Sequence, residues 1–548
     1  MRPIAWLAVV LCLTGCTAPA GDGTTERRNY LWLADQDDVP TLDPAHGYDT
    51  ASWQFEEMLF NTLVDYDDAG HLVPELAARW DVDATQRRYT FVLRSGVRFT
   101  NGRTLTSEDI RYAIERVLQP ATRSPGAEFF RGLVGAAACA TTACRVAGIT
   151  TPDAHTIRFE LTEHDPLFVH KLAMPFAAAV PAEAVARWGE DFARHPVGSG
   201  PFVLREWRPG QRVVLERNPD YFVPGVPRLP GIVRLVGVNS DLAWLKYEAG
   251  QIDVASIPPA EFPRVVRSPA YRAHLRQVTT MRTSYLGMNC AVAPFSDRRV
   301  RQAMNYAINT SKLLRLINDR GVVAHGVLPP NMPGYNPDLR GYPFAPDEAR
   351  RLLASAGYAA GLSTTLWVRS DETALRLAQS VQQDLADVGV AVRIKAIAWG
   401  PFLEAVRTPG LVPFFSLGWE ADFPDPSNFL DVLLHSRAIG TNNNTHYRNA
   451  EVDALLDAAA GALDAAARLA ALRRAEELIV ADAPWVFLYH PVSYVIVNAR
   501  VRDFVLHPLR PPRLERVWLA GDAARPADAA ASAVAPGRAG PPLPGLAS

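Results

Sequence analysis

Tyr89-Thr-Phe-Val-Leu-Arg94 alternates apolar and polar side chains, and this alternation predicts a β-strand. A turn-rich connection follows from Gly96 to Gly102. Thr106-Ser-Glu-Asp109 then predicts a helix start, because a threonine followed three residues later by an acid is close to a capping box. The predicted helix ends before Pro120, and its apolar stripe consists of Ile110, Ala113, Ile114, Val117 and Leu118. A strand that leads into an amphipathic helix indicates an α/β protein.

The second half of the chain repeats this order of elements. Pro346-Asp347-Glu348 opens a helix with a proline and two acids in its first turn. Another helix is predicted from Thr373 to Val388, and the strand Val390–Ile397 follows it. Strand–helix–strand units of this kind predict mostly parallel sheets.

The length and composition indicate a large globular protein. The chain has 548 residues, more than the roughly 250–300 at which a single core stops growing, so two or more lobes are expected. A net charge of −2 provides no basic surface for nucleic acid, and no nucleic-acid partner is expected. No segment after the N-terminal region approaches the length of a membrane span.

The N-terminal region has the arrangement of a secretory signal. Arg2 precedes a short apolar run from Ile4 to Leu13, which is about half of the roughly 20 residues that a spanning helix needs. The run ends at Leu13-Thr14-Gly15-Cys16, which resembles the bacterial lipoprotein box. We therefore expect a signal peptide at residues 1–15 and a lipid on Cys16; a plain signal peptide with an incidental cysteine is the alternative.

Both ends of the mature chain are expected to lack a packed structure. Residues 16–28 are small, polar and charged and are predicted to be a flexible tether. Residues 521–548 are rich in Ala, Pro and Gly and have too few large apolar side chains to offset chain entropy, so a disordered tail is expected.

Two cysteines are close enough in sequence to form a small loop. Cys139 and Cys144 are five residues apart, and a disulfide between them is expected in an oxidising compartment. A metal clip is the competing interpretation, but no histidine accompanies the pair, and no metal site is predicted.

Catalytic signatures are sparse. Val197-Gly198-Ser199-Gly200 resembles a nucleophile elbow only superficially, because the motif would need glycine at position 197. No P-loop, dinucleotide fingerprint or H-E-x-x-H motif is present. We therefore expect no enzymatic activity and no cofactor.

An aromatic and acidic stretch is the strongest candidate binding site. Gly418 to Pro426 is predicted to be a loop at the end of the apolar run Val412–Leu417, and it contains Trp419 and Asp422. Trp399 also follows directly on a predicted strand. Loops at the carboxyl ends of strands bind ligands in open α/β sheets, and a carboxylate can accept from an ammonium group. The alternative is that both tryptophans belong to the core and Asp422 caps a turn.

Taken together, these motifs resemble the bacterial extracellular solute-binding proteins of family 5, over about residues 41–518. The resemblance rests on segments spread along the chain: Thr41-Leu-Asp-Pro44, Leu72-Val-Pro-Glu-Leu-Ala77, Tyr89 to Asp109, Gly198-Ser-Gly-Pro-Phe202, Arg217-Asn-Pro-Asp-Tyr221, Gly250-Gln-Ile-Asp253, Phe295 to Ala303 and Asp347 to Tyr358.

The resemblance implies a two-lobed periplasmic-binding-protein-like α/β fold, of type II with an extra subdomain, that closes on a ligand by a hinge. Lobe I would take residues 29–284, with a subdomain inserted at about 70–195. Lobe II would take residues 285–485, and residues 486–520 would return to lobe I.

The resemblance also implies roles for particular residues. In peptide-binding members, an aspartate placed like Asp422 holds the ligand's α-ammonium, and Trp419 and Trp399 resemble pocket residues. Phe129 and Phe130 are aromatics in a comparable region of the first lobe. Residues 36–38, with Gln36 and Asp38, could pair with an extended ligand by strand addition. Arg376 or Arg369 is the candidate for a ligand carboxylate; either arginine could equally be a solvated surface charge.

The function implied is that of a substrate-binding component of an ABC importer. It would capture di- or oligopeptides outside the membrane, as a monomer in the periplasm or at the cell surface anchored through Cys16, and deliver them to permease subunits. Another solute, such as an oligosaccharide, a nickel chelate or haem, is the alternative within this class. A surface enzyme or a chaperone-like binder is the alternative from another class.

Overall fold

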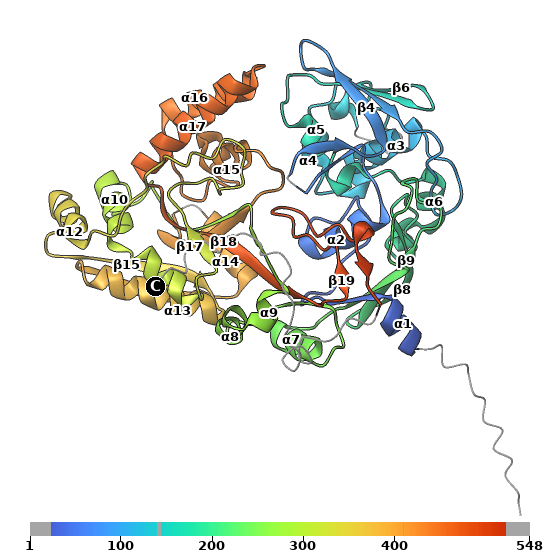
Figure 1. Cartoon of the computed structure of the whole chain (residues 1–548). Coiled ribbons are helices and arrows are strands. Elements are labelled where there is room, and N and C mark those ends of the chain that lie inside the picture. Colours follow the sequence, from blue (N-terminus) through green and yellow to red (C-terminus); the bar gives the residue numbers. More distant parts are fainter. Residues whose placement is uncertain (1–22, 69, 140–143, 409, 522–548) are drawn as a thin grey trace, which may run out of the picture.

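The computed structural model describes residues 23–68, 70–139, 144–408 and 410–521, and these residues form two lobes (Figure 1). The expected signal peptide, Cys16 and all but the first residue of the expected tail lie outside the described residues. The lobe that contains β1, β4–β10 and α2–α6 is called lobe I below, and the lobe that contains β13–β17 and α10–α17 is called lobe II. No helix among the described residues is long and apolar enough to cross a membrane.

Lobe I contains two four-stranded sheets. The outer sheet has the order β4 (Ala77–Val82), β5 (Arg88–Leu93), β7 (Thr156–Glu160), β6 (Ile149–Asp153), and all neighbours are antiparallel. The inner sheet has the order β1 (Leu31–Ala34), β10 (Gly231–Leu235), β9 (Arg212–Arg217), β8 (Phe202–Arg208), and only β1 and β10 are parallel.

The helix predicted after Thr106 is present as α3 (Ser107–Leu118), and it packs on the outer sheet of lobe I. Thr106 and Asp109 form the capping box, and all members of the predicted apolar stripe are buried. The other elements of this lobe are β2 (Val64–Tyr66), β3 (Leu72–Pro74), α2 (Thr50–Leu59), α4 (Ala127–Phe130), α5 (Phe168–Lys171) and α6 (Ala182–Trp188).

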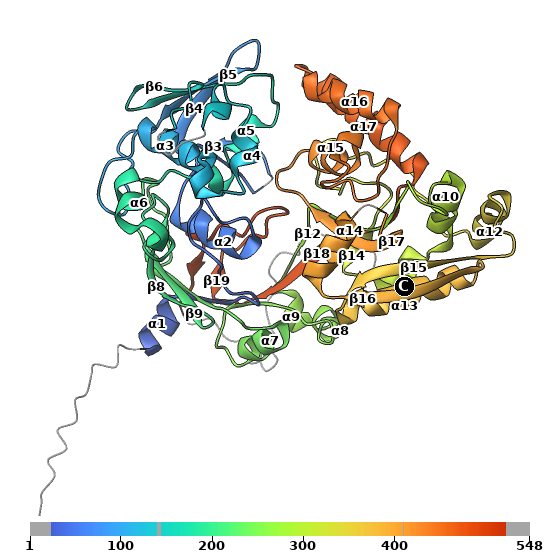
Figure 2. The ribbon, with the colours of Figure 1, turned by 180° about the vertical axis from the view of Figure 1, so that it is seen from behind.

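Lobe II is built on an eight-stranded mixed sheet with helices on both faces (Figure 2). Its main order is β11 (Val254–Ser256), β18 (Trp485–Val497), β13 (Arg282–Met288), β17 (Phe414–Glu420), β15 (Leu362–Arg369), β16 (Val390–Ile397), while β12 (Leu275–Thr279) and β14 (Gly321–Val323) pair with β18. Its helices are α10 (Arg298–Ala307), α11 (Thr310–Leu316), α12 (Pro346–Ser355), α13 (Glu372–Ala386), α14 (Trp399–Arg407), α15 (Ser427–Leu434), α16 (Ala450–Gly461) and α17 (Ala465–Asp482).

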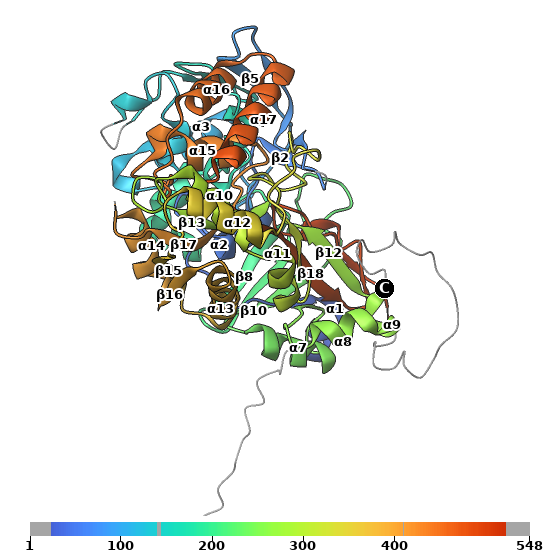
Figure 3. The ribbon, with the colours of Figure 1, turned by 90° about the vertical axis from the view of Figure 1, so that its left-hand side faces the viewer.

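The long strand β18 joins the two halves of the molecule. Its first residues pair with β13 of lobe II, and its last residues pair with β11 and β12, next to β1. The helices α7 (Ser240–Glu248), α8 (Phe262–Arg267) and α9 (Pro269–Arg272) lie beside this connection, and β19 (Val501–Arg502) and β20 (Trp518–Leu519) follow it (Figure 3).

Three expectations about local structure are wrong. The sheets are not mostly parallel, because short hairpin connections join β4 to β5 and β6 to β7, and a hairpin forces antiparallel pairing. Residues 23–28 are not a flexible tether: they belong to α1 (Gly23–Asn29), where Arg27 binds the buried Asp253 at 3.0 Å. The predicted loop begins only after Glu420, because β17 continues to that residue by pairing with β13.

Candidate ligand-binding site

The two lobes approach each other at Asp422, just beyond the end of β17. The hydroxyl of Tyr48, in lobe I, donates to Asp422 Oδ1 over 3.4 Å. From lobe II, Asn428 Nδ2 donates to Asp422 Oδ2 at 3.0 Å, and Asn428 Oδ1 accepts from the Asp422 backbone N–H at 3.1 Å. Asp422 is therefore held by a side chain of its own lobe and contacted by the other.

Among the described residues, the Asp422 carboxylate has neutral hydrogen-bond donors but no cation in direct contact with it. Within the described chain it makes no ion pair, and it is partly buried. Burial raises the pKa of Asp422 above its ordinary value, and the hydrogen bonds from Asn428 and Tyr48, together with the more distant charge of Arg510, act in the opposite direction. A desolvated carboxylate without a counter-ion is costly, so this position favours a cationic group supplied by a ligand.

Opposite Asp422, lobe I presents an aromatic cluster. Tyr48 packs against Trp53, Phe129 and Phe176, with ring centroids 5.9, 6.0 and 5.4 Å away. Trp53 lies on α2 and donates through Nε1 to Gly47 O at 3.0 Å, which fixes the segment that carries Tyr48. Arg510, from the segment after β18, lies 5.6 Å from the Trp53 ring and binds Glu57 at 2.7 Å.

Next to Asp422, the strands β15 and β17 diverge and leave an open cavity of about 560 Å³ between them. The two strands pair only through Leu366 and Trp367 with Phe414 and Phe415. Among the described residues, the β17 segment 417–420 therefore has no partner strand on that edge. The cavity lies at the carboxyl ends of parallel strands, where open α/β sheets bind ligands.

Several residues predicted from the sequence do lie at this place. Trp399 is the first residue of α14, is 47% exposed and lines the cavity. Arg369, the last residue of β15, lines it as well; its guanidinium lies 5.7 Å from the Trp399 ring and Nε donates to Asp371 at 2.7 Å. Trp419 points to the other face of the sheet, where its Nε1 donates to Asn428 Oδ1 at 2.9 Å, so it positions the amide that holds Asp422.

The remaining predicted residues are not brought together with Asp422. Phe130 is 1% exposed in the core of lobe I, so it packs there and only its neighbour Phe129 reaches the cleft. Asp38 accepts from Gly210 N at 2.7 Å and so stabilises the β8–β9 turn. Gln36 is exposed, and Arg376 is exposed on α13 with an ion pair of 3.9 Å to Glu372.

The side chains considered for other chemistry have structural surroundings. Cys139 and Cys144 are joined as a disulfide, with Cα atoms 4.8 Å apart. Ser199 is fully buried and donates to Asn61 at 3.0 Å, so it is not placed like a nucleophile. No group of histidine, cysteine and carboxylate residues within the described part of the chain could hold a metal ion.

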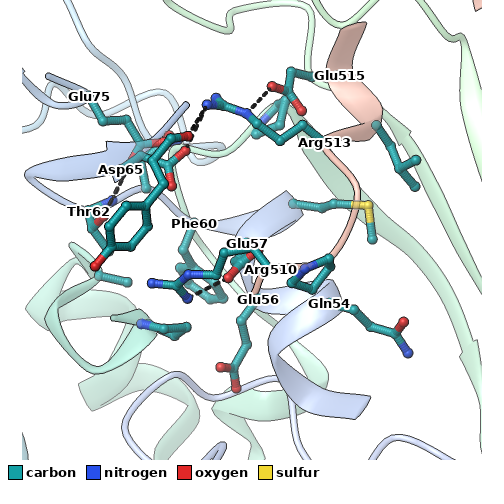
Figure 4. A pocket seen from close by; sticks show the side chains of 18 of the residues that line it. Gln54, Glu56, Glu57, Phe60, Thr62, Asp65, Glu75, Arg510, Arg513 and Glu515 are labelled. Carbon is teal, nitrogen blue, oxygen red and sulfur yellow. Dashed lines mark hydrogen bonds and ion pairs between the residues drawn. The ribbon is translucent and has the colours of Figure 1, made fainter. Parts of the chain in front are cut away.

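A second, smaller cavity lies inside lobe I, and several charged side chains line it (Figure 4). Its volume of about 60 Å³ has room for water but not for a peptide. Arg510 and Arg513 enter it from the segment after β18, and Arg513 pairs with Glu515 at 2.8 Å and Asp65 at 3.1 Å. These ion pairs attach the returning chain to lobe I and hold Arg510 beneath Trp53.

Tyr48, Trp53, Asn428 and Arg510 were not predicted from the sequence. Each is an ordinary residue in its local context, and each is important only because a distant segment lies beside it. Trp53, on an otherwise amphipathic helix, was a weak signal for a ligand-binding site. Its ring is only partly buried, and aromatic side chains often line ligand pockets.

The fold is a two-lobed periplasmic-binding-protein-like fold. The long strand β18 connects the two lobes, and the carboxylate of Asp422 lies in the cleft between them. The sequence model described as "Bacterial extracellular solute-binding proteins, family 5 Middle" matches residues 71–441. The chain belongs to this family of solute-binding proteins.

Known relatives cover most of the chain. Heme-binding protein A of Haemophilus influenzae is 28% identical over 471 residues, which make up 82% of this chain and 85% of that protein. The dipeptide-binding protein of Escherichia coli K12 is 27% identical over 484 residues, or 84% of this chain and 88% of that protein.

Solved structures show the same fold. Clavulanic acid biosynthesis oligopeptide binding protein 2 has a TM-score of 0.83 at 28% identity and covers 90% of this chain and 96% of its own. An ABC transporter-associated periplasmic binding protein from Helicobacter pylori, solved in complex with a peptide, has a TM-score of 0.74 at 28% identity, with 90% and 99% coverage.

Proposed function

We propose that this protein captures peptides with a free amino end outside the membrane and delivers them to the permease of an ABC importer. The observation that carries the proposal is the Asp422 carboxylate, which is partly buried in the cleft and makes no ion pair with any described residue. A ligand ammonium would complete this site, because a buried charge is stable only when it is paired. Relatives named as dipeptide- and di/tripeptide-binding proteins support the choice of ligand.

The unpaired edge of β17 supports a peptide rather than another amine. An extended ligand lying along residues 417–420 could hydrogen-bond to the exposed backbone, and its affinity would then depend little on side-chain identity. Trp399 and Arg369 border this edge, and Arg369 keeps guanidinium N–H groups that could bind a ligand carboxylate.

Closure of the lobes would follow from ligand contacts that both lobes make. Asp422 belongs to lobe II and Tyr48 to lobe I, so a group bound between them favours the state in which they are close. The strand β18, which pairs in both halves, is the connection about which such a hinge motion would occur.

The anchoring of the protein completes the proposal. Lipid on Cys16 would keep a monomeric receptor at the membrane, where its effective concentration near the permease is high. The protein itself would perform no chemistry, and the importer's other subunits would hydrolyse ATP.

Native mass spectrometry of the purified protein, followed by calorimetry with defined peptides, tests the proposal. We expect co-purified peptides, and we expect Asp422→Asn to weaken peptide binding by roughly 30-fold or more. Asp220→Asn, which changes an exposed aspartate of lobe I, is the matched control and should bind like the unchanged protein. Peptide binding that Asp422→Asn leaves intact would contradict the ammonium site.

A second candidate ligand is a planar ring system. The aromatic cluster of Tyr48, Trp53 and Phe129 could stack on such a ring, and one relative is named a heme-binding protein. Co-purification of a coloured ligand, with an absorbance spectrum that identifies it and a mass that no peptide explains, would favour this candidate over the first.

A further inference from the structure

We infer that the cavity between β15 and β17 is a subsite for an acidic residue of the ligand, and that Arg282 binds its carboxylate. The inference rests on the proposed capture of peptides, and it adds a preference that no comparison assigns. It also identifies a carboxylate-binding arginine different from the two that the sequence indicated.

Arg282 is a guanidinium without a partner. It begins β13 and lines the cavity, yet its side chain makes no hydrogen bond and no ion pair with any residue that the structure describes. Most arginines that line the two cavities described above are engaged: Arg369 with Asp371, Arg510 with Glu57 and Arg513 with Glu515. An arginine that lines a cavity with its donors unused can bind a carboxylate with two parallel hydrogen bonds.

The position of the guanidinium is fixed by the neighbouring strand. A Cβ atom on Gly418 of β17 would lie 3.3 Å from both Nε and Nη2 of Arg282. The guanidinium therefore lies over the backbone at Gly418, where the absence of a side chain leaves it room. This places the charge within the cavity rather than in the solvent beyond the strand ends.

Tyr489 provides a second donor near this charge. It lines the cavity and faces Ser284 across the β13–β18 pairing, two residues from Arg282. Burial raises the pKa of the Tyr489 hydroxyl, and a hydrogen bond with Ser284 and the charge of Arg282 act in the opposite direction. A phenol and a guanidinium that face one space form a suitable end for an anionic group.

The rest of the cavity suits the stem of a side chain. Its floor is made by the buried side chains of Leu366, Val368 and Leu488. An apolar floor with a cationic end matches an acidic side chain, whose methylene groups are apolar and whose tip is charged. A lysine or arginine side chain would instead place its charge against Arg282.

Two carboxylates among the described residues line this cavity: Asp371 pairs with Arg369, and Glu420 makes no ion pair. The position of Glu420 does not cancel the preference. It faces Arg282 in the pairing of β13 with β17, but no ion pair joins them, and it is exposed at the end of the strand. The Arg282 guanidinium lies two residues deeper, at Gly418, so the unpaired charge at the inner end of the cavity is cationic and the unpaired carboxylate lies at the rim.

The distance to Asp422 suits a short peptide. Gly418 and Asp422 are four residues apart, which is at most about 14 Å of extended chain. A peptide of three or four residues with its amino end at Asp422 is therefore long enough to reach Arg282.

Calorimetry with matched peptides tests the inference. The peptides are Ala-Ala-Glu-Ala and Ala-Ala-Gln-Ala, together with Ala-Ala-Glu and Ala-Ala-Gln, so that each pair differs by one charge. We expect the glutamate peptide of at least one pair to bind about 10- to 100-fold more tightly, which is the range expected for hydrogen bonds to a charged group. In Arg282→Gln this difference should disappear, while the glutamine peptides keep their affinity.

Two control measurements separate the possible outcomes. Arg272→Gln, a change of an exposed arginine on α9, should keep the preference, and thermal unfolding should show that both variants are folded. Equal affinity of both peptides in each pair, or a preference that survives Arg282→Gln, would overturn the inference while leaving peptide capture intact.

The outcome in which no peptide binds is also informative. It would contradict the proposed function, and N-acetylglutamate and N-acetylglutamine, which lack a free amine, would then test the subsite alone. Arg282-dependent binding of N-acetylglutamate only would support the acidic subsite without a peptide, and binding of neither compound would overturn it.

Discussion

Asp422 combines partial burial with a set of uncharged hydrogen-bond donors, and this combination makes it sensitive to pH. Because burial raises its pKa, the carboxylate takes up a proton at a pH above its ordinary range. A protonated Asp422 cannot pair with an ammonium, so the charge state of this one residue should control ligand binding.

We expect the affinity for a peptide to fall as the pH is lowered through the pKa of Asp422. It should also fall above about pH 8, where the α-amino group of the ligand loses its proton. Calorimetry at a series of pH values checks both limbs, and Asp422→Asn should lose the acidic limb. An acidic limb that persists in this variant would assign the titration to another group.

Glu476, on α17, shows how a buried carboxyl acts on stability rather than on binding. It is 1% exposed, and its Oε1 accepts from the backbone N–H groups of Val327 and Leu328, both at 2.9 Å. Burial raises its pKa from 4.5 to about 7. The folded state therefore binds more protons than the unfolded state between these values, and stability falls as the pH rises from about 4.5 to about 7.

Glu476→Gln should remove this part of the pH dependence. The amide keeps an acceptor for the two backbone groups and cannot ionise. Between pH 5 and pH 8, the free energy of unfolding of the unchanged protein should therefore fall by about 1–3 kcal/mol more than that of the variant. Denaturant unfolding at both pH values is the measurement. Equal pH dependence in the two proteins would show that Glu476 ionises with its ordinary pKa.

At the scale of elements, a loop and a helix end are in close contact in lobe I. The segment Gly198-Ser199-Gly200 lies against the C-terminal end of α2, and Gly200 N donates to Leu59 O at 3.0 Å. A Cβ on Gly200 would lie 2.4 Å from the Leu59 carbonyl carbon and 2.5 Å from Met58 O. These glycines permit a close backbone approach.

Gly200→Ala should therefore destabilise lobe I by about 1–3 kcal/mol or more, because the added methyl overlaps backbone that cannot move alone. Gly132→Ala is the matched control, since a Cβ there meets nothing within 4 Å. Thermal unfolding of the two variants checks the difference. Similar melting temperatures would mean that the loop shifts easily away from α2.

At the scale of the whole molecule, the two lobes also touch far from Asp422. Gln86, in the turn between β4 and β5, donates through Nε2 to Leu463 O at 3.0 Å. His164 donates through Nε2 to Ala462 O at 3.2 Å. Residues 462–463 connect α16 to α17, so these hydrogen bonds join the tips of the lobes above the cleft (Figures 1 and 3).

Removing this tip contact should shift the molecule toward a more open arrangement. Two hydrogen bonds of about 0.5–1.5 kcal/mol each would change the equilibrium between closed and open states by about 5-fold or more. We expect Gln86→Gly with His164→Ala to enlarge the radius of gyration in small-angle scattering and to weaken ligand binding without touching the ligand. Glycine is used because Gln86 has a φ of 50°.

Gln211→Ala, a change of an exposed glutamine within lobe I, serves as the control for the tip contact. Unchanged scattering and unchanged affinity in the double variant would show that ligand contacts and β18 alone set the arrangement of the lobes.

The sequence by itself determined the elements whose signals are local. The strand Val390–Ile397 and the start of α3 match their predictions, because side-chain alternation and a capping box act within a few residues. The same short motifs indicated the family, which the comparison confirms. Asp422 could be proposed because its neighbours in sequence are unusual.

Only the tertiary structure decided how these elements pair and which side chains meet. Tyr48 and Asp422 are 374 residues apart, and Arg282 reaches Gly418 only because β13 and β17 are antiparallel neighbours. The open edge of β17 exists because β15 separates from it after two paired residues. Strand direction, cavities and contacts between lobes arise from long-range packing, and no local pattern of residues encodes them.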